Sequence, residues 1–219
     1  MRMSWPVEWQ SFLGDARLVV VLVRHGETLW NRERRFLGVT DLELDDHGRK
    51  QARTLGDWLQ NRLDRVYCSP LRRAHETALC RDATPIPDRA WMEMHQGELE
   101  GLSREQAVER FPTLVASWLQ NPVEISAPGG ETLRACRDRA WAALERLVAV
   151  HPTGIIGVVS HQMVISSLTC TACGDALPNW RAHALPNAAC TVLVREEGRF
   201  RVAIHAFRPP EVIALESSR

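Results

Sequence analysis

The fold follows from one stretch of the sequence, Leu18-Val19-Val20-Val21-Leu22-Val23, and from the polar residues Arg24-His25-Gly26-Glu27 that come directly after it. An apolar run that is rich in β-branched residues and has no polar face predicts a strand buried on both sides, as at the centre of a mainly parallel sheet. Ligands bind preferentially at the carboxyl ends of such strands. We therefore expect this polar cluster to lie at a functional site.

The composition is that of one globular domain without net charge. Of the 219 residues, 45% are hydrophobic and 25% are charged, which is ordinary usage for a folded protein. The 27 Lys and Arg residues balance the 27 Asp and Glu residues, so no overall field attracts nucleic acid or an anionic membrane surface. We expect neither as a partner, and any affinity for phosphate must come from local groups.

The N-terminal segment and the cysteines favour a reducing compartment. The apolar runs are too short to span a bilayer, and residues 1–15 carry Trp5, Trp9 and Phe12 without the features of a signal peptide. We predict a docked or frayed extension over residues 1–16 and a single domain over 17–219. With no export signal, the six cysteines are expected to remain thiols, and we assign the protein to the cytoplasm.

Helical and strand patterns alternate along the rest of the chain. Apolar spacing and turn residues predict, in order, a helix over 52–63, a strand over 65–68, a helix beginning near Pro70, helices over 102–120 with a break at Pro112, and a helix over 133–147. A second buried strand, 154–160, ends at His161, and two alternating runs around Glu197 and Gly198 predict a hairpin. This order predicts an α/β protein, a three-layer α/β/α sandwich with a mainly parallel sheet.

Two strand ends therefore carry a histidine. Metal-free phosphoryl transfer needs a nucleophile, positive charge around the equatorial oxygens, and an acid for the leaving oxygen. A neutral His25 can attack through one ring nitrogen while the other is held by a hydrogen bond. Arg24, Arg73 and His161 can neutralise the developing charge, since the guanidinium fork binds phosphate bidentately. These residues predict phosphoryl transfer without a metal ion or another cofactor.

Four blocks of sequence extend this pattern across most of the chain. They are Leu22-Val23-Arg24-His25-Gly26-Glu27-Thr28, Ser69-Pro70-Leu71-Arg72-Arg73-Ala74-His75-Glu76-Thr77-Ala78, Glu93-Met94-His95-Gln96-Gly97-Glu98-Leu99-Glu100-Gly101 and Val158-Val159-Ser160-His161. With Pro128-Gly129-Gly130-Glu131 and Asn187, they resemble the histidine phosphatase superfamily, which includes cofactor-dependent phosphoglycerate mutases. The resemblance runs from about Leu18 to Ala206 and implies a phosphoglycerate mutase-like fold and a histidine phosphatase domain.

The resemblance also implies roles for the site residues. His25 would become a phosphohistidine, and the first residue of the third block, Glu93, would be the general acid. The phosphoryl group and substrate would be bound by Arg24, Arg73, His161, Asn31 and Gly38. Burial would raise the pKa of Glu93 while nearby arginines would lower it, so the sequence leaves the protonation state of this carboxyl open.

The sequence favours hydrolysis over transfer to a second substrate. Phosphoglycerate mutases usually carry threonine at the position of Leu37 and a long insertion with paired arginines after the general-acid segment. This chain has only a compact helical stretch between Gly101 and Gly129. The resemblance therefore implies a metal-independent phosphatase. Two alternatives stay open: a mutase-type phosphotransferase, and a catalytically inactive module that binds a phosphorylated ligand.

The substrate is defined only as a class. We expect a small phosphomonoester, that is, a small phosphorylated metabolite such as a sugar phosphate, phosphoglycerate or phosphoserine. The walls that select it are expected to come from residues 37–40 and 102–128. A homodimer is a possible assembly.

Several other residues have a structural interpretation that competes with a functional one. Glu98 and Glu100 compete with Glu93 as the acid, although a turn with solvated or arginine-paired carboxylates explains them better. Arg72 should lie on the surface, because adjacent helical residues point about 100° apart.

Four further residues also have two competing interpretations. Cys170 and Cys173 have the spacing of a redox or zinc pair, but a buried pair of thiols is the favoured interpretation. Trp30 and His183 could reach the pocket, with a core or polar surface position as the alternative.

Overall fold

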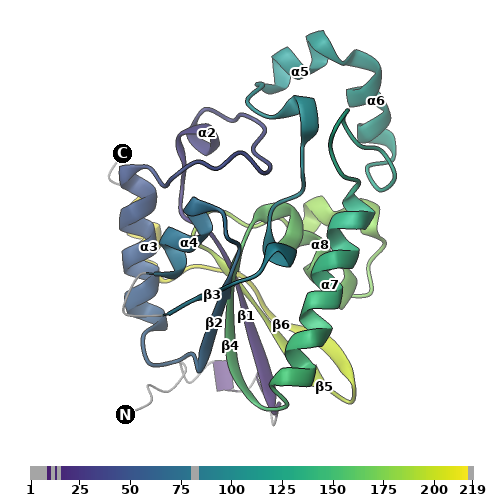
Figure 1. Cartoon of the computed structure of the whole chain (residues 1–219). Helices are drawn as coiled ribbons and strands as arrows, with labels where there is room; N and C mark the ends of the chain where they lie inside the picture. The colour runs from purple at the N-terminus through teal and green to yellow at the C-terminus, as the bar shows by residue number, and fades with distance from the viewer. Residues whose placement is uncertain (1–8, 11–12, 14–15, 80–83, 217–219) are drawn as a thin grey trace.

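The computed structural model describes residues 9–10, 13, 16–79 and 84–216, arranged as in Figure 1. The strands are β1 (Leu18–Arg24), β2 (Arg65–Cys68), β3 (Ile86–Pro87), β4 (Gly154–Ser160), β5 (Cys190–Glu196) and β6 (Arg199–Phe207). The α-helices are α2 (Leu29–Arg32), α3 (Asp46–Leu59), α4 (Arg72–Ala78), α5 (Arg104–Arg110), α6 (Pro112–Gln120), α7 (Leu133–Val150), α8 (Gln162–Ala172) and α9 (Pro210–Ala214). Short 3-10 helices are η1 (Arg89–Trp91), η2 (Gly97–Leu99) and η3 (Leu177–His183).

β1 lies between β4 and β5 in a sheet whose described strands follow the order β3-β2-β4-β1-β5-β6. The strands from β1 to β4 are mutually parallel, whereas β5 is antiparallel to both of its neighbours. Residues 18–23 are at most 5% exposed. The prediction of a buried central strand in a mainly parallel sheet is confirmed, as is the hairpin formed by β5 and β6.

Helices cover both faces of the sheet, which confirms the three-layer α/β/α architecture (Figure 1). Leu18, Val20 and Leu22 of β1 pack into a core with α7 and α8. The intervening valines pack into a second core with α3, α4 and α9. Because successive side chains of a strand point to opposite faces, one apolar strand serves both cores.

The N-terminal segment is described only in part. Trp9 is 4% exposed, and its ring lies 5.1 Å from Trp58 and 4.7 Å from Phe207, measured between ring centroids. Trp9 is therefore docked on the second core, whereas Trp5 and Phe12 lie outside the described residues. The division of the chain at residue 16 stays a prediction.

The predicted helices are present, with two shifts of boundary. The helix predicted over 52–63 is α3, which begins earlier, at Asp46 with Asp45 as its N-cap, and ends at Leu59. The break at Pro112 separates α5 from α6, and Pro112 occupies the first turn of α6, where its missing N–H costs nothing. α4 begins at Arg72 and not near Pro70, because the backbone at Leu71 is still extended. No helix in the described part of the chain is long and apolar enough to cross a membrane.

α5 and α6, residues 104–120, form a cap beyond the carboxyl edge of the sheet (Figure 1). The cap has a small apolar cluster of its own, in which Leu99, Ala107 and Ala127 are buried. Phe36, from the loop after α2, packs against the same cluster. The cap is therefore held over the sheet edge by this cluster and by Trp118 of α6, which packs against the first main core beside Trp180, with the ring centroids 5.8 Å apart.

The N-terminus of α3 approaches the loop after β1 closely. The backbone N–H of Asp45 donates to the Glu27 carbonyl at 3.1 Å, and Gln51 accepts a hydrogen bond from the Glu27 N–H at 2.9 Å. A Cβ atom on Gly48 would lie 2.0 Å from the Glu27 carbonyl oxygen, and one on Gly26 would lie 2.5 Å from the Gly48 oxygen. Two glycines thus allow the helix to support the loop that follows β1.

This approach predicts that Gly48→Ala destabilises the protein. In an open helix the change would stabilise by about 1 kcal/mol, because alanine has the higher helix propensity. Here the added methyl group meets backbone, so we expect a net loss of about 1–3 kcal/mol in the free energy of unfolding. Urea denaturation measures it, with Arg53→Ala on the exposed face of α3 as the control. Equal or greater stability of Gly48→Ala would show that the approach is not tight.

Candidate active site

The ends of β1 and β4 bring two histidines together. Arg24 pairs with Ser160 in the parallel register, and the His25 N–H donates to the Ser160 carbonyl at 3.1 Å. His161 follows as the residue that precedes α8. The ring centroids of His25 and His161 lie 5.1 Å apart, and the residues are 3% and 0% exposed. The structure thus brings the ends of the two histidine-bearing strands together, as predicted.

The His25 ring is held in one tautomer. Its Nδ1 lies 2.6 Å from the Gly26 carbonyl oxygen, which can only accept a hydrogen bond. Nδ1 therefore carries the proton, and Nε2 keeps its lone pair. Burial, and then the charges of Arg73 and Arg24, hold the pKa of His25 well below its usual 6.5. His25 is thus a neutral imidazole at physiological pH.

Two arginines are fixed beside this ring by backbone carbonyls. Arg73 of α4 is 0% exposed and donates to the carbonyls of Gly38, at 2.6 Å, and Thr40, at 2.9 Å. Arg24 donates to the Leu185 carbonyl at 2.7 Å. The Nε atoms of both arginines are buried and have no hydrogen-bond partner among the described residues. Burial lowers the pKa of each guanidinium to about 10, so both remain cationic at neutral pH.

His161 adds further polar atoms without partners. Both of its ring nitrogens are buried and lack a hydrogen-bond partner in the described part of the chain. Burial first, and then the positive charge of Arg73, keep the pKa of His161 well below 6.5. Buried polar groups are normally hydrogen-bonded, so this cluster has the donors that an anionic ligand would need.

Glu93 lies against the same cluster. It is 5% exposed, and its carboxylate oxygens accept hydrogen bonds from the backbone N–H groups of Met94, at 2.9 Å, and Met163, at 3.2 Å. Burial raises the pKa of Glu93 above its usual 4.5, and the hydrogen bonds and the two arginines only partly oppose this. The sequence left open whether burial or the nearby arginines dominate the pKa of Glu93, and in the structure burial dominates.

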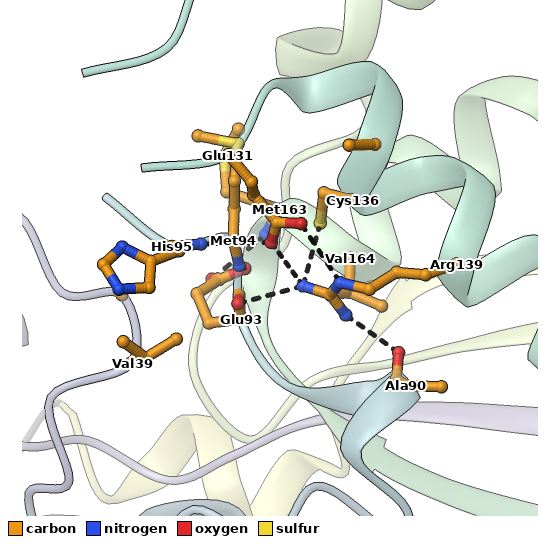
Figure 2. A network of polar contacts seen from close by, with 12 residues as sticks. Val39, Ala90, Glu93, Met94, His95, Glu131, Cys136, Arg139, Met163 and Val164 are labelled. Atoms are coloured by element: carbon orange, nitrogen blue, oxygen red, sulfur yellow. Dashed lines mark hydrogen bonds and ion pairs between the residues drawn. The ribbon is translucent and has the colours of Figure 1, made fainter. Parts of the chain in front are cut away.

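Figure 2 shows how Arg139 of α7 fixes the segment that carries Glu93. Its guanidinium donates to the carbonyls of Ala90, at 2.9 Å, and of Glu93, at 3.0 Å. Glu131 accepts from the same guanidinium at 2.6 Å and also from the backbone N–H of His95 at 3.1 Å. Glu131, the last residue of the Pro-Gly-Gly-Glu motif, thus helps to position the segment that carries Glu93, because its carboxylate bonds both to Arg139 and to the backbone of His95.

Glu100 has a structural position that the sequence analysis did not anticipate. We expected its carboxylate to be solvated or paired with arginine, and this expectation is wrong. The side chain is 10% exposed and accepts hydrogen bonds from the N–H groups of Val39, at 2.9 Å, and Thr40, at 2.7 Å, and from the Thr40 hydroxyl. A turn of unpaired backbone N–H groups prefers an anionic acceptor. Glu100 therefore holds the loop whose carbonyls fix Arg73.

Asn187 is a site residue that we did not include among the candidates. Its Nδ2 donates to the His25 carbonyl at 3.0 Å and to Asn31 Oδ1 at 3.2 Å. The same Asn31 oxygen accepts a hydrogen bond from the Thr28 N–H at 3.2 Å. The two asparagines therefore brace the loop around His25. The position of Asn187 before the last strands was the only signal in the sequence.

Part of this cluster lines a cavity of about 610 Å³, whereas Arg73 and His161 are 0% exposed and are not among its lining residues. Its polar inner wall includes Arg24, His25, Asn31, Glu93 and Asn187, and its other walls come from the cap, from residues 34–37 and from single residues of other segments. Leu37 and cap residues between Arg104 and Leu119 line it, in accord with the predicted walls. Gly38 is buried behind the wall, where its carbonyl holds Arg73.

The other weighed residues lie outside this cavity. Arg72 is 55% exposed and pairs with Glu43 at 2.6 Å, as expected for a surface residue. Nε2 of His183 bonds with Asp175 at 2.7 Å, and the Trp30 ring packs beside Gly101. The prediction of a buried pair of thiols is wrong for Cys173, which is exposed, although Cys170 is buried. Among the described residues, no cluster of three or more His, Cys, Asp or Glu side chains could hold a metal ion.

Comparison with known proteins agrees with this fold and site. Residues 20–207 match the model of the histidine phosphatase superfamily, branch 1. The chain is 31% identical to phosphoserine phosphatase 1 of Hydrogenobacter thermophilus, over 82% of this chain and 88% of that protein. It is 38% identical to phosphoglycerate mutase-like protein 4 of Arabidopsis thaliana, over 68% of each chain. The solved structure of Bacillus stearothermophilus YhfR superposes with a TM-score of 0.83 at 27% identity, over 89% of this chain and 99% of that one.

The chain therefore belongs to the histidine phosphatase superfamily, and the resemblance stated from its sequence blocks is confirmed.

The lowered histidine pKa values predict how folding stability depends on pH. Below pH 6.5 the unfolded chain protonates His161 while the folded protein does not, so the free energy of unfolding falls as the pH decreases toward the folded-state pKa. His161→Gln removes this contribution. We expect its stability to depend less steeply on pH between 6.5 and 5, by up to about 1.4 kcal/mol per pH unit. Denaturant unfolding at several pH values measures both slopes, and identical slopes would contradict a neutral, buried His161.

Proposed function

We propose that this protein is a phosphatase that hydrolyses a small phosphomonoester through a phosphohistidine at His25, with Glu93 as the general acid. One observation carries the proposal. A neutral imidazole with a free Nε2 lies beside two buried guanidiniums that have unpartnered Nε atoms, and a buried carboxyl with a raised pKa lies against the same cluster. These are the nucleophile, the charge and the acid that phosphoryl transfer needs.

In the first step, Nε2 of His25 attacks phosphorus and the bond from phosphorus to the ester oxygen breaks. The electron pair of that bond goes to the leaving oxygen, which takes the proton of Glu93 and departs as an alcohol. Arg24 and Arg73 bind the equatorial oxygens, and His161 donates one ring N–H to them. The Gly26 carbonyl stabilises the positive charge that develops on the His25 ring, because it accepts the hydrogen bond from Nδ1.

In the second step, water attacks phosphorus and the bond from phosphorus to Nε2 breaks. The carboxylate of Glu93 accepts a proton from the water, and the electron pair returns to His25. Glu93 is thus reprotonated for the next turnover, and phosphate leaves. The clamp of Arg139 and Glu131 matters in both steps, because the Glu93 carboxyl must face first the ester oxygen and then the water.

Hydrolysis is favoured over mutase activity by the walls of the cavity and by the relatives. Leu37 lines the cavity, and it offers no hydrogen bond to a substrate carboxylate. One relative, matched over 82% of this chain and 88% of its own length, is named as a phosphoserine phosphatase. The mutase reaction remains a competing proposal, since another relative is named as phosphoglycerate mutase-like.

The covalent intermediate can be tested directly. The reaction is stopped during turnover without acid, and the intact protein and its peptides are then analysed by mass spectrometry for an added phosphoryl group. We expect a phosphoryl group on His25 and none in His25→Asn. Because arginines supply the charge in this mechanism, activity should persist in the presence of a chelator.

Two results would contradict this reading. Loss of activity in chelator with recovery on adding Mg²⁺ would assign the charge stabilisation to a metal. Isomerisation of 3-phosphoglycerate, primed with bisphosphoglycerate, that runs faster than phosphate release from every tested monoester would favour the mutase.

The acid role of Glu93 predicts a dependence on the leaving group. General acid catalysis contributes about 10² to 10⁴ in rate, and an alkoxide needs it far more than a stabilised aryl oxide. Glu93→Gln should therefore lose at least tenfold more kcat on an alkyl phosphate than on para-nitrophenyl phosphate. Steady-state kinetics with both substrates measures the difference.

Glu98→Gln is the matched control, because Glu98 is half exposed and pairs with Arg110 at 2.9 Å. It should change neither substrate by more than about twofold. Equal losses of Glu93→Gln on both substrates would indicate that Glu93 binds or folds the site without acting as the acid.

A further inference from the structure

The cavity extends well beyond the groups that would bind a phosphoryl group. The residues at its inner end, His25 and Glu93, are at most 5% exposed. From there it reaches the cap and η3, and its volume of about 610 Å³ is that of a site for a whole organic molecule. The outer part of the cavity must therefore recognise the remainder of the substrate.

Exposed arginines from three separate segments line this outer part. They are Arg34 after α2, Arg104 at the start of α5 and Arg181 in η3. No acidic group of the described chain lies within ion-pair distance of any of them. The neighbouring Glu105 accepts a hydrogen bond from the Ser103 hydroxyl at 2.8 Å, and its pKa is lowered mainly by hydrogen bonds and least by the charge of Arg104. By contrast, Arg35 in the same wall is neutralised by Glu33 at 2.6 Å.

Arg181 is held in place by aromatic rings. Its guanidinium lies 4.8 Å from the ring centroid of Trp118 in the cap and 4.8 Å from that of Trp180. A stacked guanidinium keeps its edge N–H groups available for a planar anion, and stacking reduces the entropy lost on binding. Partial burial and the charge of Arg104 lower the pKa of Arg181. The two cations are therefore close enough to repel each other.

Apolar residues from two segments also line the cavity, beside the polar side chains of Gln96 and Gln162. Leu114, Val115 and Leu119 of α6 line it, together with Phe36 and Leu37 from the loop after α2. The cavity lining thus combines buried groups that would bind phosphoryl, apolar side chains, and exposed arginines. A ligand that fits all three carries an anion at each end and a hydrocarbon segment between them.

We propose that Arg104 and Arg181 form a second anion subsite, and that the substrates are phosphomonoesters whose far end carries a carboxylate or a second phosphate group across an apolar spacer. This inference rests on the proposed phosphatase reaction at His25. The proposed substrate class is narrower than the small phosphomonoesters expected from the sequence. A neutral apolar ester would offer the two guanidiniums no negative charge to bind.

A series of ω-phosphooxyalkanoates, with three to eight methylene groups, tests the proposal against the carboxamides of the same length. The two series share the leaving group and the spacer and differ in the distal charge alone. We expect the wild-type protein to prefer the carboxylate by roughly three- to tenfold in kcat/KM at a preferred length, mostly through KM. The preference should shrink as salt is added. Alkanediol bisphosphates of the same lengths show whether the subsite prefers carboxylate or phosphate.

Arg104→Gln and Arg181→Gln should each reduce the preference for the carboxylate about threefold or more and leave the carboxamides within twofold of wild type. Arg110→Gln is the matched control, since Arg110 lies on α5, outside the cavity lining, and pairs with Glu98. Equal kcat/KM for carboxylates and carboxamides at every length would overturn the second subsite. A carboxylate preference that both variants retain would assign it to other residues and also overturn the proposal.

Failure of the phosphatase proposal would look different. In that case neither series would be hydrolysed and no phosphohistidine would form. Hydrolysis of both series at equal rates, with phosphorylated His25, would instead leave the reaction intact and remove only the distal subsite.

Discussion

The parallel pairing of β1 with β4 is the constraint on which the rest of the site depends. Seven successive residues of each strand face each other in register, from Leu18 opposite Gly154 to Arg24 opposite Ser160. A slip of one residue would turn every side chain of a strand to the other face. It would also separate the two histidines that follow the strands. Since both strands are buried on both faces, the two hydrophobic cores fix the register and thereby fix the site.

The electrostatics of the site follow from the same burial. The arginines remain charged although they are removed from water, while the histidines are kept neutral and the pKa of Glu93 is raised. Each of these pKa shifts favours the uncharged form of its group, as expected in a region of low dielectric constant. What remains is positive charge held by backbone carbonyls, which cannot neutralise it. In the proposed reaction, an entering phosphoryl group would meet cations whose positions are fixed by the fold, so little reorganisation would be needed.

Local patterns made some of these features predictable and left others invisible. The apolar run before His25 predicted the central strand because burial on both faces leaves no polar positions, and the sequence blocks placed Arg73, Glu93 and His161 in one site. Side chains that hydrogen-bond to the backbone of segments far away in the sequence gave no such signal. Glu100 could not be assigned, because nothing in its surroundings shows which N–H groups it will meet. Arg181 was missed because its neighbour Trp118 belongs to a helix far away in sequence.

The small apolar cluster of the cap has a consequence for how such proteins diverge. Its buried residues, Leu99, Ala107 and Ala127, are separate from the cores that hold the sheet. Apart from Trp118, which packs against the first core, residues 104–120 can therefore accumulate substitutions or insertions with little penalty in the folding of the scaffold. Selection can exchange the cap as an independent module, and with it the molecule that the cavity accepts, while the chemistry at the sheet edge is inherited unchanged.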